Sequence, residues 1–214
     1  LRKALRFVSD KKAAEIKLLS VGYEKYLGHS FQTITADYAA MRKEYCDRLT
    51  ESMQGMVDKL SADGFNISSQ VGWAHPRYEA IVKEAQEFGA DLLVQHCRAF
   101  AKIKHIHLTH DSWQLVKHCP LPLLLVKDEE WGDSVVLMAA VDPMNSHHKP
   151  VQLDGQIIDA VTSVSGQLGG EYHVVHAYAE SARPFTPAGK IKEEHTKAFN
   201  DFMSNYNVNE DKLH

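Results

Sequence analysis

The histidines are the residues with the most obvious chemical potential, and the chain contains 13 of them. The segment Lys104–His110 reads Lys-His-Ile-His-Leu-Thr-His. In a strand, His105 and His107 would project from one face, where two imidazoles could bind zinc or nickel. Apart from Asp111, which follows closely, the spacing supplies no further ligand. We therefore interpret this segment, and likewise His147–His148, as surface loops, and we keep a histidine-dependent metal-binding protein as an alternative.

Nucleophilic catalysis would need a serine or cysteine beside a base. Cys97 and Cys119 each neighbour a histidine in the sequence, but sequence neighbours rarely share a site. Neither cysteine lies in a Gly-x-Ser-x-Gly elbow. With Cys46 they are too few and too scattered for a disulfide framework or a Cys-x-x-Cys zinc site, which favours a reducing, cytoplasmic compartment. We predict no catalytic residues, no metal site and no enzymatic activity.

Two strand-like runs place polar groups where a ligand could bind. Ser134–Val141 leads into Asp142 and Pro143, and Glu171–His176 ends on a histidine. The carboxyl ends of parallel strands share one edge, which is the usual ligand edge of doubly wound folds. We therefore predict ligand binding by Val141, Asp142, Pro143 and His176. The alternative is that Asp142 only caps the turn before the proline.

Composition narrows the class of protein. The chain has 214 residues, of which 44% are hydrophobic and 24% charged, and these values suit a packed protein rather than a disordered, collagenous or coiled-coil chain. The net charge of −4, without a block of like charges, makes a nucleic-acid partner unexpected. The longest apolar run, Pro120–Val126, is too short for a membrane span, so we expect no membrane partner. The chain begins without methionine, and we expect it to be part of a longer protein.

Hydrophobic periodicity predicts alternating helices and strands. Strands are expected near 16–21, 65–71, 91–94 and 121–126, and helices within 1–13, from Thr35 to Gly64, from Pro76 to Gly89 and over 111–118. The long helix carries an apolar stripe that includes Met41, Met53, Met56 and Leu60. This alternation predicts an α/β fold, with a parallel sheet covered by helices on both faces.

The order of elements then starts again. Strands are expected at 134–141 and 171–176, with a helix carrying Leu153, Ile157, Val161 and Val164 between them. Four identities lie 156 positions apart: Ala4 and Ala160, Val8 and Val164, Ser9 and Ser165, Glu15 and Glu171. We interpret this repeat as a tandem duplication. The predicted domains are 1–130, whose first strand would lie upstream of Leu1, and 131–214, the N-terminal half of the second copy.

Several motifs resemble those of the universal stress protein family. The run His118-Cys-Pro120-Leu-Pro122 before a closing strand, and Ala140-Val-Asp142 after a first strand, are similar to family hallmarks. Trp73-x-x-Pro76, Asp111-Ser-Trp113 and Val126-Lys-Asp128 resemble the tandem, E-type subclass. The resemblance implies a Rossmann-like (adenine nucleotide alpha hydrolase-like) fold with five parallel strands per domain. It also implies a bacterial stress-response role without known catalysis, and ATP binding in some members.

Nucleotide-binding relatives carry Gly-x2-Gly-x9-Gly-(Ser/Thr), because backbone amides must approach phosphate oxygens closely. The corresponding positions here are His96, Ala99, Thr109 and His110, so we expect the first domain to have lost the phosphate cradle. No cofactor is certain, and ATP or another small ligand is expected only in the second domain. An ATP-binding or ATP-hydrolysing enzyme of the same superfamily is the alternative. As partners we expect an intramolecular pseudo-dimer of the two domains, with a homodimer as a further option.

Overall fold

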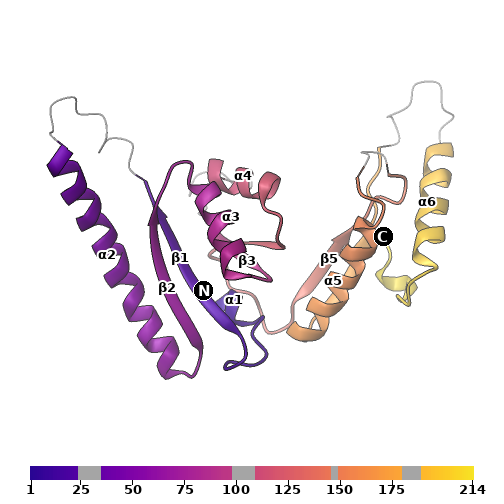
Figure 1. Ribbon diagram of the computed structural model, residues 1–214. Helices are drawn as coiled ribbons and strands as arrows, with labels where there is room; N and C mark the ends of the chain where they lie inside the picture. The colour runs from indigo at the N-terminus through magenta and orange to yellow at the C-terminus, as the bar shows by residue number, and fades with distance from the viewer. Residues whose placement is uncertain (24–34, 98–108, 146–148, 180–188) are drawn as a thin grey trace. The chain divides into compact units, whose positions relative to one another are not determined.

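A computed structural model describes residues 1–23, 35–97, 109–145, 149–179 and 189–214 (Figure 1). The chain divides into two compact units, Leu1–Glu130 and Trp131–His214. Helices and strands alternate along each unit, as the hydrophobic periodicity predicts, and every strand pair is parallel.

The described residues of unit 1 form four strands and four helices. In chain order they are α1 (Arg2–Leu5), β1 (Glu15–Gly22), α2 (Thr35–Ala62), β2 (Asn66–Trp73), α3 (Arg77–Phe88), β3 (Leu93–His96), α4 (His110–His118) and β4 (Leu123–Val126). The helix expected within 1–13 is confined to α1, because the chain turns after Leu5. The strand expected at 91–94 lies two residues later, as β3.

The strands of unit 1 form two separate ladders rather than one continuous sheet. β1 pairs with β2, from Glu15 opposite Asn66 to Gly22 opposite Trp73, and β3 pairs with β4. Within the described residues, β1 and β3 each have one hydrogen-bonded neighbour. The expected five-stranded sheet is therefore not seen in this part of the chain, because no described strand joins the two ladders.

Only part of the apolar stripe of the long helix α2 is buried within unit 1. Met53 and Leu60 are buried against the rest of unit 1. Met41 and Met56, on the same predicted stripe, remain 44% and 41% exposed. The chain leaves the helix through Gly64, whose φ of 88° suits a residue without a side chain. Apolar periodicity thus predicts the helix correctly, and the described residues of unit 1 cover only part of its stripe.

In the described part of unit 2, two parallel strands alternate with two long helices. Its elements are β5 (Val136–Ala140), α5 (Leu153–Leu168), β6 (Glu171–Val175), α6 (Lys190–Met203) and the short 3-10 helix η2 (Glu210–Lys212). β5 and β6 pair from Val136 opposite Glu171 to Ala140 opposite Val175. The strand and helix residues of the core meet in one cluster of Ala139, Val141, Ile158, Val174, Phe199 and Met203.

The C-terminal residues lie beside β6. Leu213 forms a parallel bridge with Val174, the His214 amide donates to the Val174 carbonyl (2.9 Å), and the His176 amide donates to the His214 carbonyl (2.9 Å). In unit 1, β2 lies parallel to β1 in the same way. The strand–helix–strand order of unit 1 therefore recurs in unit 2.

The turns that lead into β1 and β6 are built differently. In unit 1, the Asp10 carboxylate accepts hydrogen bonds from the amides of Lys12 (2.8 Å) and Ala13 (3.2 Å). In unit 2, the Ser165 hydroxyl donates to the carbonyl of Gly170 (2.7 Å). Gly170 also passes so close to β5 that a Cβ there would lie 2.2 Å from the Val135 carbonyl oxygen. A glycine is required at that position because any side chain would collide with backbone.

A search of the described helices found none that combines the length and the apolar composition needed to cross a membrane.

Candidate functional site

The predicted ligand residues of unit 2 do meet at the carboxyl edge of its sheet. Val141 follows β5, and its amide donates to the Val175 carbonyl at the end of β6 (3.0 Å). His176 follows β6, and its Nδ1 lies 3.1 Å from the Val141 carbonyl oxygen. Asp142 and Pro143 come directly after Val141. The structure therefore brings the strand ends together as parallel pairing requires.

A largely buried ion pair between Lys149 and Asp154 holds the turn that contains Asp142. The Asp142 amide donates to Asp154 Oδ1 (3.2 Å), and Lys149 Nζ donates to the Asp142 carbonyl (2.7 Å). Lys149 and Asp154 are also hydrogen-bonded to each other. Their side chains are only 17% and 7% exposed, so the pair is held in a weakly hydrated environment. Both backbone polar groups of Asp142 are thus bound within the protein.

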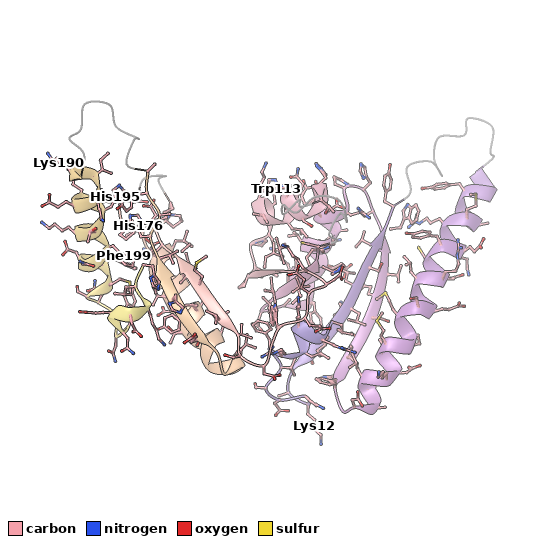
Figure 2. All side chains as sticks on the ribbon, turned by 180° about the vertical axis from the view of Figure 1, so that it is seen from behind. Lys12, Trp113, His176, Lys190, His195 and Phe199 are labelled. Atoms are coloured by element: carbon pink, nitrogen blue, oxygen red, sulfur yellow. The ribbon has the colours of Figure 1, made fainter. Side chains whose placement is uncertain are left out.

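Two imidazoles connect the strand end to α6. Because a carbonyl oxygen only accepts, His176 Nδ1 must carry a hydrogen that it donates to Val141. In neutral His176 the Nε2 atom is then an acceptor, and it lies 2.7 Å from His195 Nδ1, which must be the donor. Figure 2 shows His176, His195 and Phe199 grouped between α6 and the end of β6. His176 is therefore oriented from both sides.

A cavity of about 770 Å³ opens beside this pair. Its described walls come from the segment after β6, from α6 and from the C-terminal segment: His176, Tyr178, His195, Thr196, Phe199, Asn200, Met203, Ser204, Tyr206, Val208, Glu210, Leu213 and His214. Sequence reasoning found only His176 among them. The available signal was the helical spacing of His195 and Phe199, four residues apart, together with the strand-like spacing of His176 and Tyr178.

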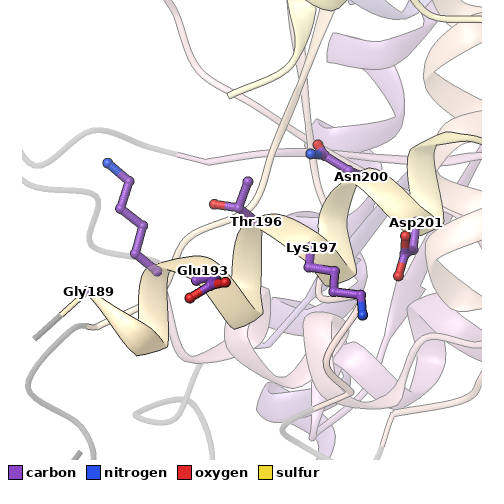
Figure 3. Close-up of a pocket in the computed structure, with 7 residues that line it drawn as sticks. Gly189, Glu193, Thr196, Lys197, Asn200 and Asp201 are labelled. Atoms are coloured by element: carbon purple, nitrogen blue, oxygen red, sulfur yellow. The ribbon is translucent and has the colours of Figure 1, made fainter. Parts of the chain in front are cut away.

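A second hollow, of about 550 Å³, lies on α6 and is lined by Gly189, Lys192, Glu193, Thr196, Lys197, Asn200 and Asp201 (Figure 3). These residues all belong to one helix or directly precede it. Acidic and basic side chains alternate along it, and no second element contributes a described wall. This hollow does not gather a set of groups that could define a ligand.

In unit 1, the positions that correspond to the family's glycines carry side chains with contacts of their own. His96 Nε2 lies 2.7 Å from Asp128 Oδ1. Thr109 caps α4, since its Oγ1 accepts from the Ser112 amide (3.3 Å), and His110 is the first residue of that helix. The remaining position, Ala99, lies outside the described residues. The N-terminus of α4, where a phosphate could bind, is capped by the chain itself.

The other chemical candidates do not form a reactive arrangement in the described part of the chain. Cys97 is buried, with its thiol 3.7 Å from the Ser112 hydroxyl, and all three cysteines are free. Among the described residues, no group of three or more histidine, cysteine or acidic side chains could hold a metal ion. His105, His107, His147 and His148 fall outside those residues, so the metal alternative stays a prediction.

Comparison with known proteins agrees with the motifs. The model of the universal stress protein family matches residues 1–127. Among curated proteins, the chain is 24% identical over 204 residues to a universal stress protein E homolog of Haemophilus influenzae, covering 93% of this chain and 65% of that protein. It is 23% identical over 190 residues to universal stress protein E of Escherichia coli K12, covering 78% of this chain and 60% of that protein. The chain thus spans less than two thirds of the length of either relative.

Solved structures show the same fold. A protein of unknown function from Pseudomonas aeruginosa PAO1 superimposes with a TM-score of 0.72 at 19% identity, covering 100% of this chain and 66% of that one. A crystal structure from P. aeruginosa UCBPP-PA14, provisionally described as a universal stress protein, gives a TM-score of 0.71 with the same identity and coverage. The α/β, Rossmann-like architecture expected from the sequence is confirmed at this level.

Proposed function

Because the chain belongs to the universal stress protein family, we propose that it is a non-catalytic bacterial stress-response protein that binds a small ligand through unit 2. The family membership supports the stress-response role. The ligand step rests on one observation: the strand ends carrying Val141, Asp142 and His176 meet beside a cavity of about 770 Å³. A nucleotide or another small molecule would bind there.

Unit 2, in this proposal, is the first half of a second universal stress protein domain. The 156-residue offset supports this interpretation, because β1 begins at Glu15 and β6 at Glu171. The pairing of Val174 with Leu213 also repeats the parallel pairing of β1 with β2. The alignment with the H. influenzae relative extends over 93% of the chain and therefore reaches beyond unit 1. The pseudo-dimer and the homodimer stay predictions.

Unit 1 has a structural role in the same proposal. Support comes from Thr109, which caps the helix end that a phosphate would otherwise approach, and from His96, which is bound to Asp128. A histidine or threonine side chain would also occupy space that the glycines of nucleotide-binding relatives leave open. For the cellular location we propose the cytoplasm, since the three cysteines are all unpaired.

The test is a calorimetric titration of the full-length protein with ATP and with unphosphorylated nucleosides. We expect saturable binding of at least one of them, and Asp142→Ala should weaken it more than about tenfold, or about 1.4 kcal/mol. Asp159→Ala, which removes an exposed carboxylate from α5, is the matched control and should leave the affinity unchanged. An unaltered affinity in Asp142→Ala would reduce that residue to a turn former, and no binding of any compound would refute the ligand step.

A further inference from the structure

The cavity beside the strand ends of unit 2 is large enough to enclose most of a small organic molecule. Its volume of about 770 Å³ falls within the usual range of roughly 300–1,000 Å³ for small-molecule sites. Its described walls come from three stretches: the segment after β6, the helix α6 and the C-terminal segment. The chemistry of these walls restricts which ligand would be stable inside.

The part of the cavity nearest the strand end is walled by a series of nearly parallel rings. Tyr178 and His195 have ring centroids 4.8 Å apart and an interplanar angle of 12°. His195 and His176 follow at 5.0 Å and 27°, and His176 and Phe199 at 6.1 Å and 20°. These rings therefore stack on one another, and a flat ligand ring would stack on a ring face that the series leaves uncovered. Such stacking gains contact area and quadrupole attraction at little cost in conformational entropy.

The charges around the cavity disfavour a phosphate. Of the described lining residues, Glu210 is the one with a formal charge when the histidines are neutral, and that charge is negative. Lys149 lies near the same strand end, but its ammonium group is bound to Asp154 and to the Asp142 carbonyl. A phosphate group entering the cavity would lose hydration without gaining a described cationic partner.

Neutral polar groups complete the walls. Thr196, Asn200, Ser204 and Tyr206 supply hydroxyl and amide groups that can donate or accept hydrogen bonds. Such groups match hydroxyls, amides or ring nitrogens on a ligand without requiring charge. The cavity therefore combines ring stacking with uncharged hydrogen bonding.

We propose that the cavity of unit 2 binds an uncharged, planar aromatic or heteroaromatic compound and discriminates against its phosphorylated forms. This inference rests on the proposed function and names the ligand class of that site. A nucleoside is a suitable probe, because its base is planar, its sugar carries hydroxyls, and its mono- and triphosphates differ from it mainly in charge.

The experiment compares adenosine, AMP and ATP as ligands of the full-length protein by calorimetry and saturation-transfer NMR. Adenosine is expected to bind at least about tenfold more tightly than either phosphate. Glu210→Gln should narrow that preference by about threefold, because it removes the negative charge from the wall. A tighter affinity for AMP or ATP would overturn the inference while leaving the proposed function standing.

Two further variants test whether the ring binds in this cavity. Tyr178→Leu removes one wall of the ring series and should weaken adenosine binding by about threefold to tenfold. Tyr78→Leu is the matched control, because it removes the same ring type from unit 1, where Tyr78 stacks on His118, and Tyr78 does not line the cavity. Equal affinities in wild type and Tyr178→Leu would overturn the inference even if adenosine binds. Failure of all three probes to bind would overturn both the inference and the ligand step of the proposed function.

Discussion

The carboxyl ends of β1 and β6 lie at equivalent places in the two units, yet the space next to them is used differently. In unit 1, Gly22 ends the strand directly beneath Tyr45, and a Cβ on Gly22 would lie 2.7 Å from Tyr45 Cε1. Tyr45 in turn packs edge-on against Trp73, with ring centroids 5.5 Å apart. In unit 2, the 156-residue offset places Tyr178 at the position of Gly22, and its ring lines a cavity.

Unit 1 has therefore filled its strand end with its own aromatic side chains. Tyr23 also stacks on His75 there, at a centroid distance of 4.1 Å, and Arg42 lies 5.8 Å from the centre of the Trp73 ring. In unit 2, the rings of Tyr178 and His195 border open space instead. The comparison teaches that the same order of elements can lead to a strand end filled by side chains in one unit and to a strand end beside a cavity in the other. Three pairs of substitutions test how the two units differ.

The largest effect is expected at the glycine before β6. Gly170→Ala would place a methyl group against the Val135 carbonyl, and we expect a loss of about 3 kcal/mol in the unfolding free energy of unit 2. Unit 1 has Ala14 at the position 156 residues earlier, so the requirement belongs to unit 2 alone. Denaturant unfolding monitored in both units would measure the loss.

Gly166→Ala is the control for that substitution. It lies on α5, and a Cβ there would meet nothing within 4 Å. Alanine should stabilise the helix slightly at this position. If Gly170→Ala were as stable as Gly166→Ala, the close approach of the turn to β5 would be wrong.

A smaller effect is expected where unit 1 closes its strand end. Gly22→Ala should force the Tyr45 ring to shift away from the strand and cost about 1 kcal/mol. Gly72→Ala on the neighbouring strand is the matched control, since its Cβ would meet Val21 at an ordinary 3.8 Å. The near-ultraviolet circular dichroism of the Tyr45–Trp73 pair should change only in Gly22→Ala. A tolerant Gly22 would mean that unit 1 also keeps free space at this edge.

The smallest effect concerns the turns that precede β1 and β6, and it depends on pH. Hydrogen bonds from the amides of Lys12 and Ala13 lower the pKa of Asp10 from its ordinary value of 3.8. The ionised carboxylate therefore stabilises the folded state above about pH 3.8, and this contribution is lost as the pH falls through the lower, folded-state pKa. The stability difference between wild type and Asp10→Asn should accordingly shrink on acidification, as measured by unfolding between pH 7 and pH 2.

Ser165→Ala provides the comparison from unit 2. The Ser165 hydroxyl makes a neutral hydrogen bond to Gly170, so its loss should cost about 0.5 kcal/mol at either pH. A pH-dependent cost for Ser165→Ala, or a pH-independent one for Asp10→Asn, would show that the two turns do not differ as described.

Local sequence patterns predicted most of the elements because their causes are local. The periodicity of α2 and the glycine that follows it, Gly64, fixed that helix without reference to the rest of the chain. The apolar runs at 16–21 and 171–176 predicted β1 and β6, which begin at Glu15 and Glu171. The spacing of α2 did not determine which stripe residues are buried, since the exposure of Met41 and Met56 depends on which neighbours cover the helix.

The candidate site was predictable only where strand pairing determined it. Val141 and His176 follow the ends of paired parallel strands, so their contact follows from register. The contact between His176 and His195 spans 19 residues and depends on how α6 packs against the strand, which no spacing rule specifies. Tyr178 was likewise missed, because one tyrosine after a strand has no distinctive pattern.

The buried pair of Lys149 and Asp154 has a consequence for measurements in salt solutions. Dissolved ions screen the attraction between exposed charges, most strongly beyond a Debye length of about 8–10 Å at ordinary salt, but they act much less on charges shielded from water. The turn at Asp142 therefore keeps its geometry from dilute buffer to concentrated salt. Any change in ligand affinity with ionic strength would then report the charge of the ligand and of Glu210, while the framework around them stays constant.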